Sequence, residues 1–192
     1  KGTTEDWQKI YDKTKKSLSS TELGKIASYY YISNSTITTF NTHLKPTMGL
    51  IDIFRIFSLS EEFKSLSVRD EEKVELLELI ERLPIPIAES IEDNTAKVNI
   101  LLQAYISQMK LNGFALFSDM IYITQSAERI MRALFEICLR RGWSSITRKI
   151  LNLCKIIEHR SWLSMSPLRQ IGWFPLDLIQ KLEKKDFPWS KY

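Results

Sequence analysis

One stretch of the sequence, residues 118–141, constrains the fold more than any other. Its apolar residues recur at three- and four-residue steps, so they fall on one side of an α-helix. They are Met120, Ile123, Ala127, Ile130, Met131, Leu134, Ile137 and Cys138. Ser118-Asp119 is expected to cap the start and Gly142 to end the helix, which would be about 35 Å long. Such a helix must bury its apolar side against other parts of the chain.

The opposite side of this helix is polar and carries several arginines. It comprises Gln125, Arg129, Arg132, Glu136 and Arg140, with Tyr122 at its edge. Two interpretations fit a helix of this kind. It is either a core helix with a solvated back, or a rod laid against a nucleic-acid backbone, whose phosphates arginines bind well.

Helical patterns also dominate the rest of the chain, which predicts an all-α fold, an orthogonal or mixed helical bundle. Helices are expected at residues 23–32, 36–44, 48–59, 70–83, 95–111 and 176–185, and another is capped by Ser144 or Ser145 and ends near Glu158-His159-Arg160. The residues expected on the apolar sides are Val74, Leu76, Leu77, Ile80 and Leu83 in 70–83, Ile100, Leu101, Ala104 and Tyr105 in 95–111, and Ile146, Ile150, Leu153, Cys154 and Ile157 in the helix after residue 144. Residues 1–20 lack this helical pattern, and an N-terminal arm or small hairpin is expected there. Residues 21–163 form the predicted bundle, and 164–192 resemble the opening of a small helix-turn-helix.

Charge is unevenly spread along this chain of 192 residues, whose net charge is +4. Residues 60–93 contain eleven acidic against four basic side chains, a local net of −7. Residues 125–160 contain eight basic against three acidic ones, a local net of +5. The basic segment 125–160 is the better candidate surface for phosphates, and the acidic segment 60–93 is expected to be a solvated face.

No motif in the sequence predicts catalysis or a metal site. Gly24-Lys25 lacks the upstream glycine of a phosphate-binding loop. The two histidines stand outside any zinc-binding pattern, and Glu158-His159-Arg160 reads as a solvated last helical turn. Cys138 and Cys154 lie on apolar helix sides and are expected to be reduced core residues. No run of about eighteen apolar residues predicts a membrane span, so a soluble nuclear or cytosolic chain without a membrane partner is expected.

Aromatic residues cluster at two places. The run Tyr29-Tyr30-Tyr31 cannot face inward throughout, because neighbours on a helix lie about 100° apart, so at least one ring should reach the surface. Four tryptophans gather towards the C-terminus, where we expect them to staple short helices together. They are Trp143, Trp162, Trp173 and Trp189.

Several segments together resemble a known family. They are residues 23–32 (LGKIASYYYI), 45–54 (KPTMGLIDIF), 59–63 (LSEEF), 101–107 (LLQAYIS), 133–143 (ALFEICLRRGW), 166–170 (SPLRQ) and 184–189 (KKDFPW). Over residues 9–192 the chain is similar to the Sec63 homology unit of large Ski2-like, superfamily-two helicases. The motifs most resemble the unit of the first cassette of spliceosomal RNA helicases. Activating-signal cointegrator helicases carry a similar unit.

This resemblance implies an architecture and a set of RNA contacts. Residues 9–20 would end a winged-helix wing, 21–163 would be the helical bundle, and 164–192 would begin a helix-loop-helix. The helix at 118–141 matches the family's "ratchet" helix, which touches the translocating strand. The implied RNA-contact residues are Tyr122, Gln125, Arg129, Arg132 and Arg140. Related DNA helicases contact the strand with an aromatic residue and an arginine on this helix. The corresponding positions here are Arg129 and Tyr122, so an arginine stands at the aromatic position and a tyrosine at the arginine position.

The resemblance also implies a function. The chain would be a non-catalytic accessory domain that helps to form the RNA channel of an ATP-dependent helicase and supports snRNA unwinding in pre-mRNA splicing. It would need no cofactor of its own, whereas the parent protein would use ATP and magnesium. Its partners would be single-stranded RNA, the RecA-like and winged-helix domains of the same chain, and spliceosomal proteins in the nucleus. The alternative is a protein-interaction scaffold whose acidic 60–93 face and C-terminal tryptophans dock splicing factors or neighbouring domains.

Overall fold

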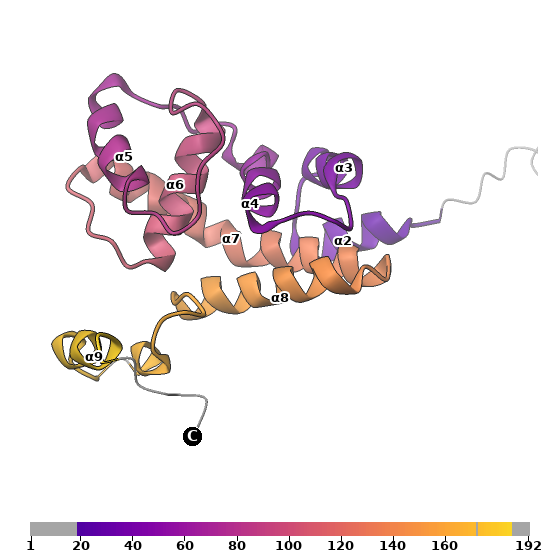
Figure 1. Ribbon diagram of the computed structural model, residues 1–192. Helices are drawn as coiled ribbons and strands as arrows, with labels where there is room; N and C mark the ends of the chain where they lie inside the picture. Colours follow the sequence, from indigo (N-terminus) through magenta and orange to yellow (C-terminus); the bar gives the residue numbers. More distant parts are fainter. Residues whose placement is uncertain (1–18, 172, 186–192) are drawn as a thin grey trace, which may run out of the picture.

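The computed structural model describes residues 19–171 and 173–185, and every regular element within them is a helix (Figure 1). The prediction of an all-α fold is therefore confirmed, whereas the arm or hairpin predicted for residues 1–20 falls almost wholly outside the described residues. The α-helices are α2 (Glu22–Tyr30), α3 (Asn34–His43), α4 (Leu50–Ser58), α5 (Lys73–Ile80), α6 (Asn94–Ile106), α7 (Phe114–Arg140), α8 (Ser144–His159) and α9 (Leu176–Glu183). Short 3-10 turns are η1 (Glu61–Phe63), η2 (Asp70–Glu72) and η3 (Pro167–Gln170).

The long helix α7 contains 27 residues and is about 40 Å long. It begins at Phe114, so the predicted start at Ser118 was wrong by four residues. The reason is a distant side chain that replaces the local cap. The carboxylate of Glu75 on α5 accepts hydrogen bonds from the backbone N–H groups of Asn112 at 2.6 Å and Gly113 at 3.0 Å. These bonds fix the entry into the helix without a capping side chain next to it.

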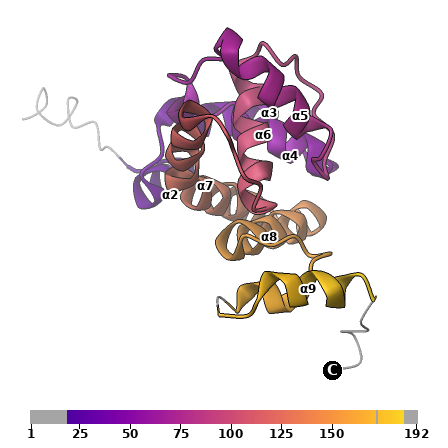
Figure 2. The ribbon, with the colours of Figure 1, turned by 90° about the vertical axis from the view of Figure 1, so that its left-hand side faces the viewer.

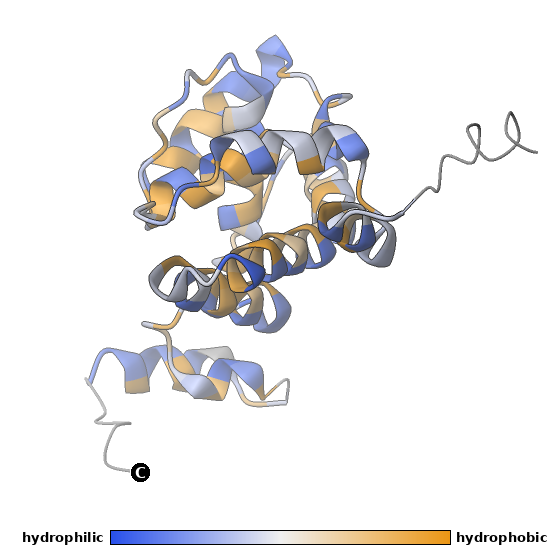
Figure 3. Cartoon of the chain, turned by 90° about the vertical axis from the view of Figure 1, so that its right-hand side faces the viewer, coloured by the Kyte–Doolittle hydropathy of each residue, from blue (hydrophilic) through white to orange (hydrophobic). Residues whose placement is uncertain are grey.

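The apolar side of α7 forms the centre of the core. All eight residues predicted for this side are buried, with at most 6% of any residue's surface exposed. The helix packs against α8, α6 and α2, and Figure 1 shows α7 and α8 side by side, between the helices α2 to α6 above them and α9 below. Hydrophobic residues gather where the helices face one another (Figure 3). Burying each large apolar side chain contributes about 1.5–3 kcal/mol, so these contacts dominate the stability of the bundle.

Helix α6 crosses the core and is buried on all sides. Residues 96–104 are buried without exception, although the sequence predicted only one inward side. The polar members of this run are satisfied within the protein. The Gln103 amide exchanges hydrogen bonds of 3.1 Å with the backbone of Ile85 and donates one of 3.0 Å to Asn99. The helix ends at Ile106, five residues before the predicted end, and Gln108 then adopts a left-handed backbone at φ 55°.

A buried ion cluster joins η2, α6 and α7. The ammonium of Lys97 is completely buried, lying 2.6 Å from a carboxylate oxygen of Glu72 and 2.6 Å from one of Asp119. It also donates a hydrogen bond of 2.8 Å to the carbonyl of Ser67, so its three N–H groups are all used. The predicted capping residue Asp119 therefore acts here as a charge partner. Burial alone would raise the pKa of Glu72, but hydrogen bonds from Lys97 and Arg69 outweigh it and lower that pKa.

Helix α5 differs from its predicted pattern. Leu76 is fully buried as predicted, but Val74 is 67% exposed and Leu77 is 53% exposed. Leu79, which the prediction left out, is buried instead. Helix α5 has only eight residues and packs on α6 through one side, which buries Leu76 and Leu79. It therefore buries fewer of its apolar residues than the sequence suggested.

The C-terminal part of the described chain stands apart from the bundle. In two views at right angles α9 lies below α8, away from the other helices (Figures 1 and 2). The carboxylate of Glu183 holds α9 on η3, since it accepts hydrogen bonds from Ser166 N at 3.0 Å and Arg169 at 2.7 and 2.8 Å. Trp162 is buried and its indole N–H donates to Ser107 Oγ at 2.8 Å, which confirms its stapling role. Trp173 is 82% exposed, so the same prediction was wrong there, and Trp189 lies outside the described residues.

Of the helices in residues 19–171 and 173–185, none combines the length and apolar character that a bilayer span requires.

Replacing Lys97 with methionine should lower the free energy of unfolding by about 3–5 kcal/mol, because the buried Glu72 and the partly buried Asp119 lose their buried cationic partner and keep only the more exposed Arg69. The exposed Lys155→Met variant is the control and should stay within about 0.5 kcal/mol. Urea titration followed by circular dichroism at pH 7 measures both. A Lys97→Met variant as stable as the parent would contradict the role of the cluster.

The same cluster predicts how stability responds to acid. Because the pKa of Glu72 is lowered in the folded state, the unfolded state binds more protons on acidification. Its contribution is complete above the ordinary glutamate pKa of 4.5 and is lost as the pH falls through the lowered value. The stability difference between the parent and Lys97→Met should therefore shrink below pH 4.5, as urea titrations at pH 7 and at pH 3.5 would show.

Candidate nucleic-acid interface

The five predicted RNA-contact residues lie along one side of α7, between positions 122 and 140. We call them the α7 stripe: Tyr122, Gln125, Arg129, Arg132 and Arg140. Each follows the previous one by three, four or eight residues, so the stripe runs almost parallel to the helix axis for about 27 Å. The described structure places all five at least partly at the surface, and each arginine of the stripe has a partner within the domain.

Arg129 is a helix cap as well as a surface cation. Its guanidinium donates a hydrogen bond of 3.3 Å to the carbonyl of Tyr30, another to the carbonyl of Tyr31 and a third of 2.9 Å to Ser126 Oγ. These carbonyls belong to the last turn of α2, which would otherwise lack hydrogen-bond donors. Tyr31 itself adopts a left-handed backbone at φ 52°, a conformation that ordinarily favours glycine. Arg129 thus ties α2 to α7, a contact that sequence spacing did not reveal.

Arg132 and Arg140 are paired with carboxylates at the surface. Arg132 contacts Glu128 at 3.0 Å and Glu158 of α8 at 2.9 Å. Arg140 contacts Glu136 at 2.5 Å and also reaches Glu22 of α2. Hydrogen bonding to Glu128 raises the pKa of Arg132, and hydrogen bonding to Glu136 raises that of Arg140. The arginine side is consequently close to neutral overall, although the surrounding sequence is basic.

The other two residues of the stripe sit at its N-terminal end. Tyr122 is 45% exposed, and its hydroxyl donates a hydrogen bond of 2.9 Å to the carbonyl of Glu62. This bond anchors the ring at the surface. Gln125 is exposed, and no hydrogen bond engages its side chain in the described part of the chain. Its amide can therefore donate to, or accept from, an approaching ligand.

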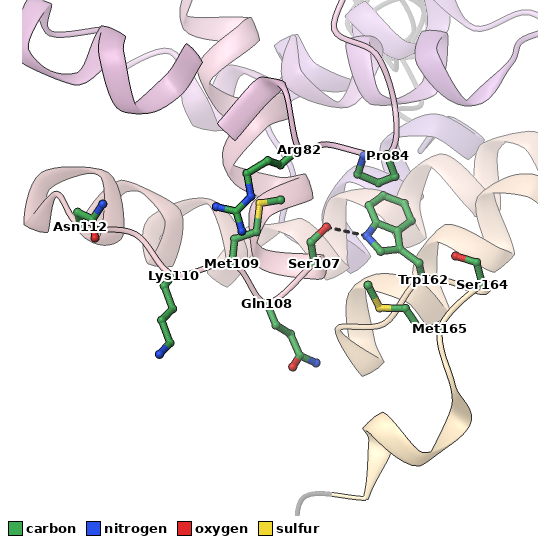
Figure 4. A pocket seen from close by; sticks show the side chains of 10 residues that line it. All are labelled: Arg82, Pro84, Ser107, Gln108, Met109, Lys110, Asn112, Trp162, Ser164 and Met165. Atoms are coloured by element: carbon green, nitrogen blue, oxygen red, sulfur yellow. Dashed lines mark hydrogen bonds between the residues drawn. The ribbon is translucent and has the colours of Figure 1, made fainter. Parts of the chain in front are cut away.

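A hollow of about 710 Å³ lies away from the stripe, between the end of α6 and the segment that follows α8 (Figure 4). Arg82, Lys110 and Trp162 contribute to its lining, and it shares no residue with the α7 stripe. Over the described residues, no group of three or more histidine, cysteine or carboxylate side chains is placed to hold a metal ion. Burial raises the pKa of Cys138 and of Cys154 to about 11, and both are free, as expected of reduced core thiols.

Residues 20–189 match the sequence profile of the family described as the Sec63 Brl domain. The chain belongs to this family. The resemblance found from the sequence motifs is thereby confirmed. The match spans all the described helices, so the bundle and the small C-terminal piece both fall within the Sec63 Brl domain.

The names of the chain's relatives include a helicase and a splicing factor. The chain is 58% identical, over 94% of its length, to the "U5 small nuclear ribonucleoprotein 200 kDa helicase" of Homo sapiens. It is 52% identical over 95% of its length to "Pre-mRNA-splicing factor brr2" of Schizosaccharomyces pombe. It is also 53% identical over 93% to "Activating signal cointegrator 1 complex subunit 3-like" of Dictyostelium discoideum. The chain spans about 8% of the length of each of these proteins.

Replacing Arg129 with methionine should release the end of α2. We expect the free energy of unfolding to fall by about 1–2 kcal/mol, because two helix-end carbonyls lose a charged donor. Amide exchange at Ile32, whose N–H closes the last turn of α2 on Ala27 O at 2.9 Å, should accelerate. Arg148→Met on the exposed side of α8 is the matched control and should change neither quantity. Unchanged exchange at Ile32 in Arg129→Met would contradict the capping role.

Proposed function

We propose that this Sec63 Brl domain is a non-catalytic accessory domain of a spliceosomal, ATP-dependent RNA helicase. In this proposal the α7 stripe forms one wall of the RNA channel and supports duplex unwinding in pre-mRNA splicing in the nucleus. The parent protein supplies ATP and magnesium chemistry through other domains. The observation that carries the proposal is the surface stripe of one glutamine, one tyrosine and three arginines on a single 27-residue helix. Helicase names among the relatives support RNA as the ligand.

The ion pairs of the stripe do not prevent phosphate binding. The side chains of Arg132 and Arg140 are 41% and 45% exposed. Exposed pairs of this kind contribute only about 0.2–1 kcal/mol, so a phosphate can replace the carboxylate at little cost. A nucleic-acid strand presents such phosphates at regular intervals, and arginine binds them with two parallel N–H groups. We expect the isolated domain to bind RNA weakly for two reasons. Carboxylates compete with phosphate for its arginines, and the domain provides only one side of the channel.

Removing the carboxylates that compete for Arg132 should strengthen RNA binding. We expect the double variant Glu128→Gln, Glu158→Gln to bind a single-stranded oligonucleotide several-fold more tightly, because the guanidinium is freed for phosphate. Arg132→Gln should weaken binding several-fold and reduce the salt dependence by about one counterion. Fluorescence anisotropy of the 192-residue chain at several salt concentrations measures these effects, with Arg148→Gln as control. Equal affinities for all variants would contradict the channel role of the stripe.

The same substitution tests the role in the whole helicase. In the full-length protein Arg132→Gln should slow unwinding of an RNA duplex about tenfold, while ATP hydrolysis without RNA stays unchanged. Arg148→Gln again serves as the control. Full unwinding by the Arg132→Gln enzyme would contradict the proposal.

The alternative function, a docking scaffold, is favoured by a different surface. The first two turns of α7 expose Phe114, Phe117 and Ile121, of which Phe114 is 85% exposed. These residues lie three and four positions apart and therefore share one side of the helix. Exposed apolar clusters mark contacts with other protein surfaces. We propose that this end of α7 docks a neighbouring domain of the helicase, which is compatible with RNA contacts further along the same helix.

Phe114→Asp distinguishes docking from folding. The isolated 192-residue chain should keep its melting temperature, because the ring is exposed and buries little surface. In the full-length helicase the same change should lower the melting temperature by several degrees, because an apolar contact between domains is lost. Differential scanning calorimetry of both proteins gives the comparison. An equal effect in the two proteins, or none in either, would count against docking at this site.

A further inference from the structure

A hollow of about 400 Å³ lies between α2 and the C-terminal half of α7. Its lining brings together two cations, one carboxylate, two aromatic rings and one aliphatic side chain: Lys25, Arg140, Glu136, Tyr29, Tyr30 and Ile26. The volume falls within the range of about 300–1,000 Å³ that holds small ligands. Apart from Arg140, none of these residues belongs to the α7 stripe.

Tyr29 presents an aromatic ring that the fold does not need. The residue is 76% exposed, and its hydroxyl makes no hydrogen bond within the described residues. The ring contacts the ring of Tyr30 nearly edge-on, at 82° and 4.9 Å between centroids. Tyr30 is itself fixed in the hollow, where burial and the adjacent Glu136 raise its pKa to about 12. An exposed ring supported from one side by a second aromatic ring can stack on a planar ligand.

The two cations of the hollow share one carboxylate partner. Lys25 Nζ lies 2.7 Å from Glu22, and Arg140 contacts the same carboxylate from α7. Hydrogen bonding to Lys25 lowers the pKa of Glu22, so this group is a carboxylate at neutral pH. Glu22 is 59% exposed and can swing away into solvent. An anionic group placed between Lys25 and Arg140 would take over both contacts.

We infer that this hollow binds one unstacked nucleotide of single-stranded RNA, whose base stacks on Tyr29 while its phosphate replaces Glu22 between Lys25 and Arg140. Glu136 accepts a hydrogen bond from an N–H group of the base. A strand that follows the α7 stripe arrives at this place, because Arg140 belongs to both. The inference rests on the proposed function, since it requires RNA along α7. A stacking ring beside two phosphate-binding cations is the combination that single-stranded nucleic acid requires.

The test uses the 192-residue chain and a single-stranded oligoribonucleotide containing one 2-aminopurine, whose fluorescence falls when it stacks on an aromatic ring. Tyr29→Ala should remove the quenching and weaken binding by about five-fold or more. Tyr29→Phe keeps the ring and should retain both. Glu22→Gln should tighten binding, because it frees Lys25 and Arg140 for the phosphate. The control is Tyr31→Ala, which changes a tyrosine that lies outside the hollow and is 86% exposed, and it should behave as the parent chain does.

The outcomes separate this inference from the proposed function. Quenching that survives in Tyr29→Ala, or an equal loss in Tyr31→Ala, would overturn the nucleotide site even if Arg132→Gln still weakened RNA binding. A chain that binds no RNA at all would overturn the proposed function first, and the nucleotide site with it. Loss of binding to a protein domain rather than to RNA in Tyr29→Ala would show that the ring serves a protein contact and would also overturn the inference.

Discussion

Burial of the apolar side of α7 is the contact on which the rest of the structure depends. Eight of its residues pack into the core against α8, α6 and α2, so the helix cannot rotate without exposing them. This fixes the direction in which its polar side points, and with it the direction of the α7 stripe. The buried Lys97 cluster fixes the other end of the helix through Asp119. A helix whose buried side is fixed in this way presents its polar side in one orientation, as a surface along which a strand moves requires.

The cations of this surface are engaged within the domain before any ligand arrives. Arg129 caps α2, while Arg132 and Arg140 are paired with carboxylates from their own and neighbouring helices. Such pairs hold the side chains in extended positions at the surface and reduce attraction to any passing polyanion. We therefore expect specific placement of a strand by the whole helicase rather than strong binding by this domain alone. The same logic applies to Glu22, which occupies the position that we assign to a phosphate.

The sequence predicted the parts of the fold that depend on local pattern. The buried side of α7, the apolar side of α8 and the reduced cysteines followed from spacing and residue type. Sequence patterns did not predict the features that depend on residues far apart in the chain. The start of α7 depends on Glu75, and the burial of Lys97 depends on two acids far along the chain. The capping role of Arg129 could not be found either, because its partners are backbone carbonyls nearly one hundred residues away. The hollow beside Tyr29 had one local signal, a tyrosine run that cannot be wholly buried. The domain boundaries and the RNA-contact residues stay predictions.

The central claim is that RNA meets this domain along α7 from position 122 to position 140 and at the adjoining end of α2. Nuclear magnetic resonance of the ¹⁵N-labelled 192-residue chain, titrated with a single-stranded oligouridylate, tests it most directly. We predict that the largest amide shifts fall on residues 122–140 and on residues 25–31, and that added salt reverses them. Shifts confined to α5 and the first turns of α7, or no shifts at saturating oligonucleotide, would contradict the claim.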